Sequence, residues 1–215
     1  MKRLLAIAAV ALLAATAFAQ DISLGKPPAT LGIDVLDAIK ARSASRAFVQ
    51  HDVPKADLAA ILWAGNGLKT ADAVSSASKA GATIAVSGDV DYVTVYVLTA
   101  KGVYRYEPAS DLLKQLSKKD ARADVTQENI PTAALMVLFA YDSAKLPSFF
   151  KGNPALGRDV AMGSAAFSAQ NIQLVAAGLK LSSVVMYNLK PAAAAAAGLS
   201  KTESLLFLTQ IGYTK

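Results

Sequence analysis

The sequence has no cysteine and only one histidine in 215 residues. Without cysteine there are no disulfides, thiol nucleophiles or iron–sulfur ligands, so packing alone must hold the fold. His51 stands beside Asp52, and no carboxylate cluster has ligand spacing, which argues against a metal site. No nucleophile-elbow motif accompanies this histidine, so a Ser-His-Asp hydrolase is disfavoured too. A glycine-rich phosphate loop is also missing, so arginines and backbone amides would have to hold any phosphate.

Long apolar runs are rare as well, and the main one stands at the N-terminus. Two cations precede it, it continues to about Phe18, and Ala17 and Ala19 occupy the small-residue positions of a signal-peptidase site. We predict a signal peptide over residues 1–19, cleaved after Ala19, and therefore a periplasmic or secreted protein. The alternative, an uncleaved membrane anchor, is disfavoured because the run is short for a membrane span.

Residues 20–215 suit one domain with a substantial core. Removing Lys2 and Arg3 from the 22 basic side chains leaves 20 against 16 acidic ones, a net charge of +4. The cations are scattered and not interleaved with aromatic residues, so nucleic-acid binding has little support. No second apolar stretch in the mature chain is long enough to suggest a membrane span.

Hydrophobic periodicity predicts a mixture of helices and strands. In the first helix, Ile33, Leu36 and Ile39 are spaced to form one apolar face, and in the second Leu58, Ile61 and Leu62 point inward. The mixture favours an α+β domain, with a mostly antiparallel central sheet flanked by helices. The predicted helices cover about 32–42, 54–65, 111–119, 157–179 and 191–199, and the strands a pair within 91–108, then 133–141, 182–187 and 203–211.

Two arginines and two serines are crowded between positions 42 and 46, after the first predicted helix. The guanidinium groups of Arg42 and Arg46 match the geometry of a phosphate and stay charged at any relevant pH. The hydroxyls of Ser43 and Ser45 could add neutral donors. Taken alone, the cluster is equally well explained as a solvated helix end, because cations favour the C-terminus of a helix.

The cluster and the helix that follows resemble the opening of the nitroreductase family of FMN-dependent oxidoreductases. That family typically begins with a helix ending Arg-x-Ser-x-Arg/Lys-x-Phe, and then a Leu-x-x-Leu-Leu-Trp-Ala-x-x-Gly helix. The subgroup that the sequence resembles most is that of the thiazole- and oxazole-forming dehydrogenases. Further similar segments follow in the family's order, so that the resembling stretches are 38–48, 58–67, 78–86, 92–108, 163–183 and 205–213.

The resemblance implies an FMN site at the interface of an intertwined homodimer, on a nitroreductase-like fold with a long central helix. Arg42 would bind the FMN phosphate, with Ser43 as its neighbour. Ala44 occupies the family's serine position, so only its backbone could contribute. Arg46 would approach the N1 and O2 edge of the ring, where a cation stabilises the anionic reduced flavin. The flavin would carry the chemistry, with no catalytic side chain.

The remaining site residues come from three later segments of the resemblance. Lys79, Ala80 and Gly81 would line the ring and the ribityl chain. Met186 and Tyr187 match the stretch whose backbone amide faces flavin N5, and Gln170 and Asn171 on the long helix would position that wall. The sequence leaves open whether the last residue, Lys215, contacts the phosphate.

The function expected from the resemblance is an exported FMN-binding oxidoreductase that passes hydride to a nitroaromatic or quinone-like acceptor. Its electron donor is unknown, because NAD(P)H is not freely available outside the cytoplasm. Departures from the family pattern at Ala44, Lys79 and Lys180 keep a second reading open, a non-catalytic flavin- or ligand-binding protein. A third reading is an acyl-enzyme, because Ser76 and Lys79 match the two fixed residues of a Ser-x-x-Lys motif.

Overall fold

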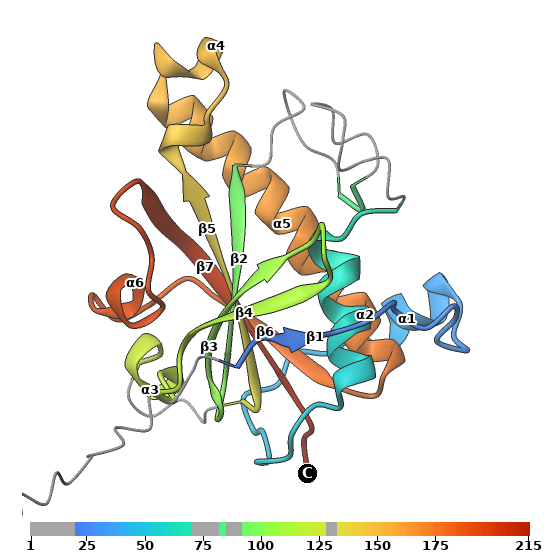
Figure 1. The fold of residues 1–215 in the computed structure, drawn as a ribbon. Helices are drawn as coiled ribbons and strands as arrows, with labels where there is room; N and C mark the ends of the chain where they lie inside the picture. The colour runs from blue at the N-terminus through green and yellow to red at the C-terminus, as the bar shows by residue number, and fades with distance from the viewer. Residues whose placement is uncertain (1–19, 70–81, 85–91, 128–132) are drawn as a thin grey trace, which may run out of the picture.

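The computed structural model describes residues 20–69, 82–84, 92–127 and 133–215. These residues build one seven-stranded sheet with helices on both of its faces (Figure 1). The strand order is β1-β4-β3-β2-β5-β7-β6, and all six ladders between neighbouring strands are antiparallel. The predicted α+β class, with a mostly antiparallel sheet flanked by helices, is confirmed.

The predicted strand pair and the three later strands are all present, with ends shifted by one or two residues. A short additional strand near the N-terminus, β1, was not predicted. The strands are β1 (Ile22–Ser23), β2 (Val93–Thr99), β3 (Gly102–Glu107), β4 (Leu112–Ser117), β5 (Leu135–Asp142), β6 (Ser182–Met186) and β7 (Glu203–Gly212). The helices are α1 (Val35–Ala41), α2 (Lys55–Asn66), α3 (Arg122–Val125), the 3-10 turn η2 (Ser143–Lys145), α4 (Ser148–Lys151), α5 (Pro154–Gly178) and α6 (Ala193–Ala196).

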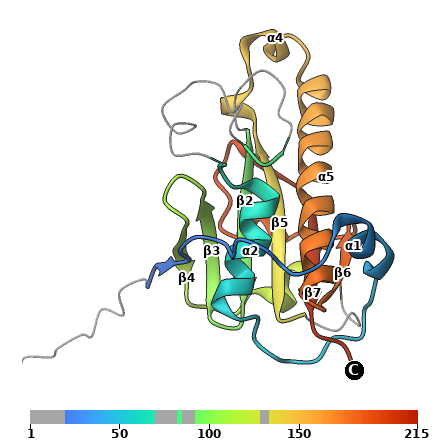
Figure 2. The same cartoon turned by 90° about the vertical axis from the view of Figure 1, so that its right-hand side faces the viewer.

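Helices cover the sheet on both sides, with α1, α2 and α5 on one face and α3 and α6 on the other (Figures 1 and 2). Because both faces of the sheet are covered, the sequence of the central strand β5 is a continuous run of mostly apolar residues, without the alternation of apolar and polar residues that a half-exposed strand shows. Its Leu135 and Phe139 pack in the layer under α2 and α5, and its Met136 and Leu138 pack in the layer under α3 and α6.

Helix α2 packs closely against α5 because Gly65 has no side chain. A Cβ atom at Gly65 would lie 2.6 Å from Cδ1 of Ile172 and 3.0 Å from Oγ of Ser168. The inward residues of α2, Leu58, Ile61 and Leu62, are buried as predicted. Although α5 has 25 residues, no helix in the described part of the chain is both long and apolar enough to cross a bilayer.

The prediction of a helix over residues 111–119 is wrong, because this segment forms strand β4. Residue Asp111 adopts a positive φ of 47°, which turns the chain into the strand instead of capping a helix. Leu113 and Gln115 are then buried on one side of a two-residue alternation. Pairing with β3 on one side and β1 on the other supplies the backbone hydrogen bonds that a helix would have made internally.

Three other predicted helices have different bounds. The first begins at Val35 because the side chain of Asp34 accepts a hydrogen bond from the Asp37 amide at 2.9 Å. The long helix begins at Pro154, after the cap residue Asn153. The helix predicted over 191–199 shrinks to the four residues of α6.

The predicted apolar face of the first helix is not buried within this chain. Leu36 and Ile39 are 64% and 52% exposed, and Val35 beside them is 63% exposed. Only the opposite side of α1, with Ala38, is buried. Leu36 and Ile39 therefore share one apolar side of α1, as their spacing indicated, and that side is exposed in the single chain.

Candidate functional site

The segment that carries Arg42 and Arg46 lies beside the edge strand β6. Ala44 forms an isolated parallel bridge with Ser183 of β6, and Phe48 forms an antiparallel bridge with Thr214. The structure therefore brings together the arginine–serine cluster, the strand that leads to Met186 and the C-terminal end of the chain.

The two arginines flank this bridge along the chain. Arg42 is the C-cap residue of α1, two positions before Ala44, and Arg46 stands two positions after Ala44, before Phe48 pairs with Thr214. Both arginines are therefore within two residues of the contact with β6.

Both guanidinium groups are free of protein partners in the part of the chain that the structure describes. No ion pair or side-chain hydrogen bond is recorded there for Arg42, which is half-buried, or for Arg46, which is exposed. The Ser45 hydroxyl already accepts the Ala47 amide at 3.1 Å, whereas Ser43 is exposed. Two unpaired guanidinium groups four residues apart form a positive surface suited to an anion.

Met186 and Tyr187 at the end of β6 face different surroundings. The Met186 side chain is buried, and its sulfur accepts a hydrogen bond from Nε2 of Gln210 at 2.7 Å. Tyr187 is 65% exposed, with its ring centroid 5.2 Å from that of Phe207. Only the backbone of Met186 can therefore face a ligand, whereas Tyr187 presents an aromatic surface.

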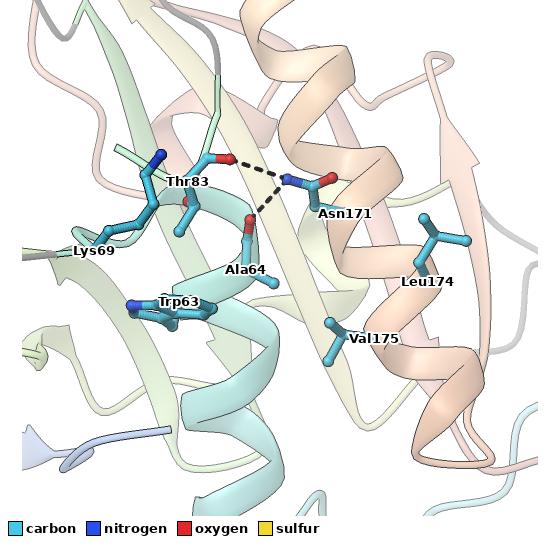
Figure 3. A pocket seen from close by; sticks show the side chains of 7 residues that line it. All are labelled: Trp63, Ala64, Lys69, Thr83, Asn171, Leu174 and Val175. Carbon is cyan, nitrogen blue, oxygen red and sulfur yellow. Dashed lines mark hydrogen bonds between the residues drawn. The ribbon is translucent and has the colours of Figure 1, made fainter. Parts of the chain in front are cut away.

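Asn171 on α5 connects two other segments of the chain (Figure 3). Its Nδ2 donates to the carbonyl oxygens of Ala64, at 3.1 Å, and Thr83, at 3.5 Å. The Ala64 carbonyl is one of the last four of α2, which have no partner inside the helix. Asn171 therefore joins α5, the end of α2 and the Thr83 segment, while Gln170 beside it is exposed.

Thr83 is fixed from a second direction as well. Its amide donates to the carbonyl of Gly67 at 3.0 Å, and the neighbouring residue Ala82 forms a bridge with Leu68. The predicted ring-lining residues Lys79, Ala80 and Gly81 lie outside the described residues, as does Ser76 of the Ser-x-x-Lys motif. The segment that follows them is thus anchored to both helices.

Sequence reasoning missed a cavity of about 310 Å³ beside Asn171, between α2 and α5 (Figure 3). This volume lies at the lower end of the range for small-molecule pockets. The Trp63 indole N–H donates to the Leu68 carbonyl at 3.0 Å, which fixes the ring as one wall. The one feature of the sequence that could have indicated this cavity is the Leu-Trp-Ala motif, which supplies Trp63 and Ala64 to its lining. The lining residues are Trp63, Ala64, Lys69, Thr83, Asn171, Leu174 and Val175.

A metal centre has no support from side-chain geometry. Within residues 20–69, 82–84, 92–127 and 133–215, no group of three or more His, Asp or Glu side chains could hold a metal ion.

Comparison with known families identifies the chain. A model of the nitroreductase family matches residues 39–213, from the arginine–serine cluster to the end of β7. The chain belongs to the nitroreductase family. The expectation drawn from the motif resemblance is therefore confirmed. A search of the curated proteins found no match to this nitroreductase-family chain.

Solved structures share the nitroreductase fold. A protein from Ralstonia eutropha, described as a nitroreductase, is 25% identical, with a TM-score of 0.81 over 91% of this chain and 90% of its own. A chain of the E. coli microcin synthetase McbBCD complex is 15% identical, with a TM-score of 0.66 over 87% of this chain and 75% of its own.

A third similar structure names a flavin in its description. The NADPH:FMN oxidoreductase from Vibrio harveyi is 16% identical, with a TM-score of 0.56 over 84% of this chain and 69% of its own. At this identity the likeness shows the fold alone. Membership of the nitroreductase family supports an oxidoreductase.

Proposed function

We propose that this protein is an exported FMN-binding oxidoreductase that reduces a small oxidised acceptor, such as a nitroaromatic or a quinone-like compound. The observation that carries the proposal is the pairing of Ala44 with Ser183, which sets two unpaired arginines along the strand that ends at Met186 and Tyr187. Membership of the nitroreductase family supports the reaction class.

The residues present fit FMN in charge. A phosphate at Arg42 and a ring near Arg46 would follow the resemblance, since the segment that carries both unpaired guanidinium groups lies beside β6. Lys215 follows Thr214, which is bridged to Phe48, so the C-terminal lysine is a candidate third cation for the phosphate.

Each side chain then has a physical task. When bound, FMN would supply the redox chemistry, by taking up and releasing a hydride at N5. Arg42 would bind the phosphate through charge-assisted hydrogen bonds. Arg46 would place a positive charge where the ring gains negative charge, and Tyr187 would cover part of the ligand with an aromatic surface.

A second copy of the chain completes the proposal. Helix α5 carries an outward stripe that includes Leu156 and Phe167, which are 48% and 55% exposed, and Gly163, where an added Cβ atom would meet nothing within 4 Å. The spacing of seven and four residues keeps all three on one side of a helix. Together with the exposed apolar side of α1, this surface suits a homodimer with FMN at the interface.

Export would change the source of the electrons that reduce FMN, but it would not change the residues that bind FMN. The predicted signal peptide over residues 1–19 would carry the protein away from the cytoplasmic pool of NAD(P)H. Another reductant would then have to reduce the bound flavin, and any such donor must reach the surface beside Tyr187.

The first test is an absorption spectrum of the purified protein after incubation with FMN and desalting. Retention of the two flavin absorption bands, in a ratio of one flavin per chain, is the expected result. Anaerobic reduction with dithionite, followed by addition of a quinone, should then bleach and restore the bands. A colourless protein after desalting would overturn the FMN proposal.

The second candidate is a binding protein that keeps the fold without turnover. Ala44 favours it, because this position lacks the hydroxyl that the family's serine would contribute. A protein that retains FMN but passes no electrons to any acceptor would support this candidate. The acyl-enzyme reading is tested separately: labelling by a fluorescent penicillin that Ser76→Ala abolishes would restore it, and no labelling would remove it.

A further inference from the structure

A second cavity, of about 240 Å³, opens where four segments far apart in the sequence meet. It lies between β1, the start of α2 with the residues just before it, the turn that joins β2 to β3, and the start of β5. It shares no residue with the segment 42–46, with Tyr187 or with the cavity beside Asn171. The lining residues are Ile22, Asp52, Val53, Lys55, Leu58, Thr99, Lys101, Ala134 and Leu135.

The interior of this cavity is apolar. Aliphatic side chains line it, and Leu58 and Leu135 among them belong to the main hydrophobic core. Its volume falls just below the range of pockets for drug-sized molecules, so a compact ligand would suit it better. Burying an apolar group against these side chains would be favourable in proportion to the area removed from water.

The rim is polar and carries a net positive charge. Lys101 and Asp52 form an ion pair of 2.8 Å there, with side chains 72% and 67% exposed. An ion pair so exposed contributes little to the stability of the fold, and its side chains can exchange partners readily. Lys55 has no ion-pair partner in the described part of the chain, so two lysines face one carboxylate.

The position of Lys55 has no explanation in the stability of its own helix. Lys55 is the first residue of α2, where a cation opposes the positive end of the helix dipole. Its N-cap Pro54 makes no side-chain hydrogen bond to the helix either. An anion at the cavity rim would be favoured both by the lysine and by the helix end.

Thr99 adds a directional donor to the same rim. Its hydroxyl oxygen accepts the Lys101 amide at 3.1 Å, and no acceptor for its own O–H is recorded among the described residues. A hydroxyl can donate one hydrogen bond while it accepts another. One carboxylate could therefore take a hydrogen bond from Thr99 and pair with the cations beside it.

We propose that this cavity is a binding site for a small amphipathic monocarboxylate, with its carboxylate at Lys55, Thr99 and Lys101 and its apolar tail against the aliphatic floor. A single negative charge would balance the net charge of the rim. An apolar tail would fill space that none of the described side chains fills.

The test is a titration of the purified protein with hexanoate, followed by backbone amide NMR and by calorimetry. Amide shifts should be largest at Val53, Lys55, Thr99 and Lys101. Affinity should rise about four-fold per methylene from butyrate to hexanoate, from the burial free energy of a CH₂ group. It should also fall as salt is added, because the rim pairs are exposed.

One test variant, two control variants and one ligand analogue identify the contacts. Lys55→Met keeps the length of the side chain, removes its charge and should lower hexanoate affinity at least five-fold. Lys201→Met, at the opposite end of the sheet, and Arg42→Ala should leave it unchanged. Hexan-1-ol should bind at least five-fold more weakly than hexanoate.

The proposal is overturned by any of three results. These are amide shifts absent from the cavity residues at millimolar hexanoate, equal affinity for hexanoate and hexan-1-ol, or a Lys55→Met variant that binds hexanoate as the parent does. Loss of hexanoate binding in Arg42→Ala would place the carboxylate at the arginine cluster instead and would also contradict it.

Discussion

Ala44 and Ser183 are 139 residues apart in the sequence and lie side by side in a parallel bridge. This single contact brings a local cluster of cations beside the edge strand β6, with Arg42 and Arg46 each two residues from the bridge. In the proposed FMN site the two arginines have different tasks, so substitutions at each should have different effects.

Arg42→Ala should weaken FMN binding by about 2–3 kcal/mol, the loss expected for a charge-assisted hydrogen bond to a phosphate. Flavin fluorescence during titration with FMN measures this affinity. The matched control is Arg158→Ala, which removes an exposed arginine of α5 and should change nothing. An unchanged affinity in Arg42→Ala would refute the phosphate assignment.

Arg46→Ala should mainly lower the reduction potential of bound FMN, because a cation near the ring favours its anionic reduced form. Loss of ~1–2 kcal/mol of such stabilisation corresponds to about 20–40 mV for a two-electron couple. Potentiometric titration with redox dyes provides the measurement. Arg46→Lys keeps the charge and should recover most of the potential, and a potential that is the same in all three proteins would exclude the role.

Phe167→Arg should convert the proposed dimer into monomers. In a two-fold interface built on α5, residue 167 of one copy lies close to the same helix of the other, so two buried arginines would repel each other. Sedimentation velocity or light scattering measures the mass. Leu116→Arg, on β4 and 42% exposed, is the control and should not alter it. A monomeric parent protein would contradict the dimer directly.

Asn171→Ala should lower the free energy of unfolding by about 1–2 kcal/mol, because the Ala64 and Thr83 carbonyls lose their donor. Asn171→Asp should be worse, since a carboxylate would face two carbonyl oxygens. Urea denaturation measures both. Gln170→Ala, the exposed neighbour, should stay within about 0.5 kcal/mol of the parent. Equal effects at 170 and 171 would show that the hydrogen bonds contribute nothing.

Asp120→Asn should destabilise the protein at neutral pH but less so in acid. The Arg122 guanidinium, whose side chain is 8% exposed, donates to both Asp120 oxygens at 2.9 and 2.7 Å and lowers the pKa of this carboxyl. A lowered pKa in the folded state stabilises the protein above the ordinary Asp pKa, and this stabilisation is lost as pH falls through the folded-state pKa.

The expected cost of Asp120→Asn at neutral pH is about 1–2 kcal/mol, less than for a fully buried pair because the Asp120 side chain is 42% exposed. Urea unfolding of both proteins from pH 7 down to below pH 4 provides the test. The difference in unfolding free energy should shrink through the acid end of this range. A difference that stays constant down to the lowest pH would contradict the linkage.

The sequence by itself determined the family and most of the sheet. The spacing in the arginine–serine cluster and in the Leu-Trp-Ala helix is local, and local spacing can be read without knowing what lies across the sheet. Strands such as β2 and β5 were also readable, because a strand buried on both faces must be apolar along its length. These features depend only on residues that are close together in the sequence.

Only the tertiary structure decided which neighbours each segment received. The segment 111–119 contains leucines and lysines, which favour a helix. It nevertheless forms strand β4, because it pairs with β3 on one side and with β1 on the other. The hydrogen bond from the Asn171 amide to the Ala64 carbonyl depends on the close approach of α2 to α5 at Gly65, which no local pattern indicated. The cavity at Lys55 joins residues from four distant segments. Such contacts depend on which surfaces are buried together, and that is a property of the whole chain rather than of any stretch within it.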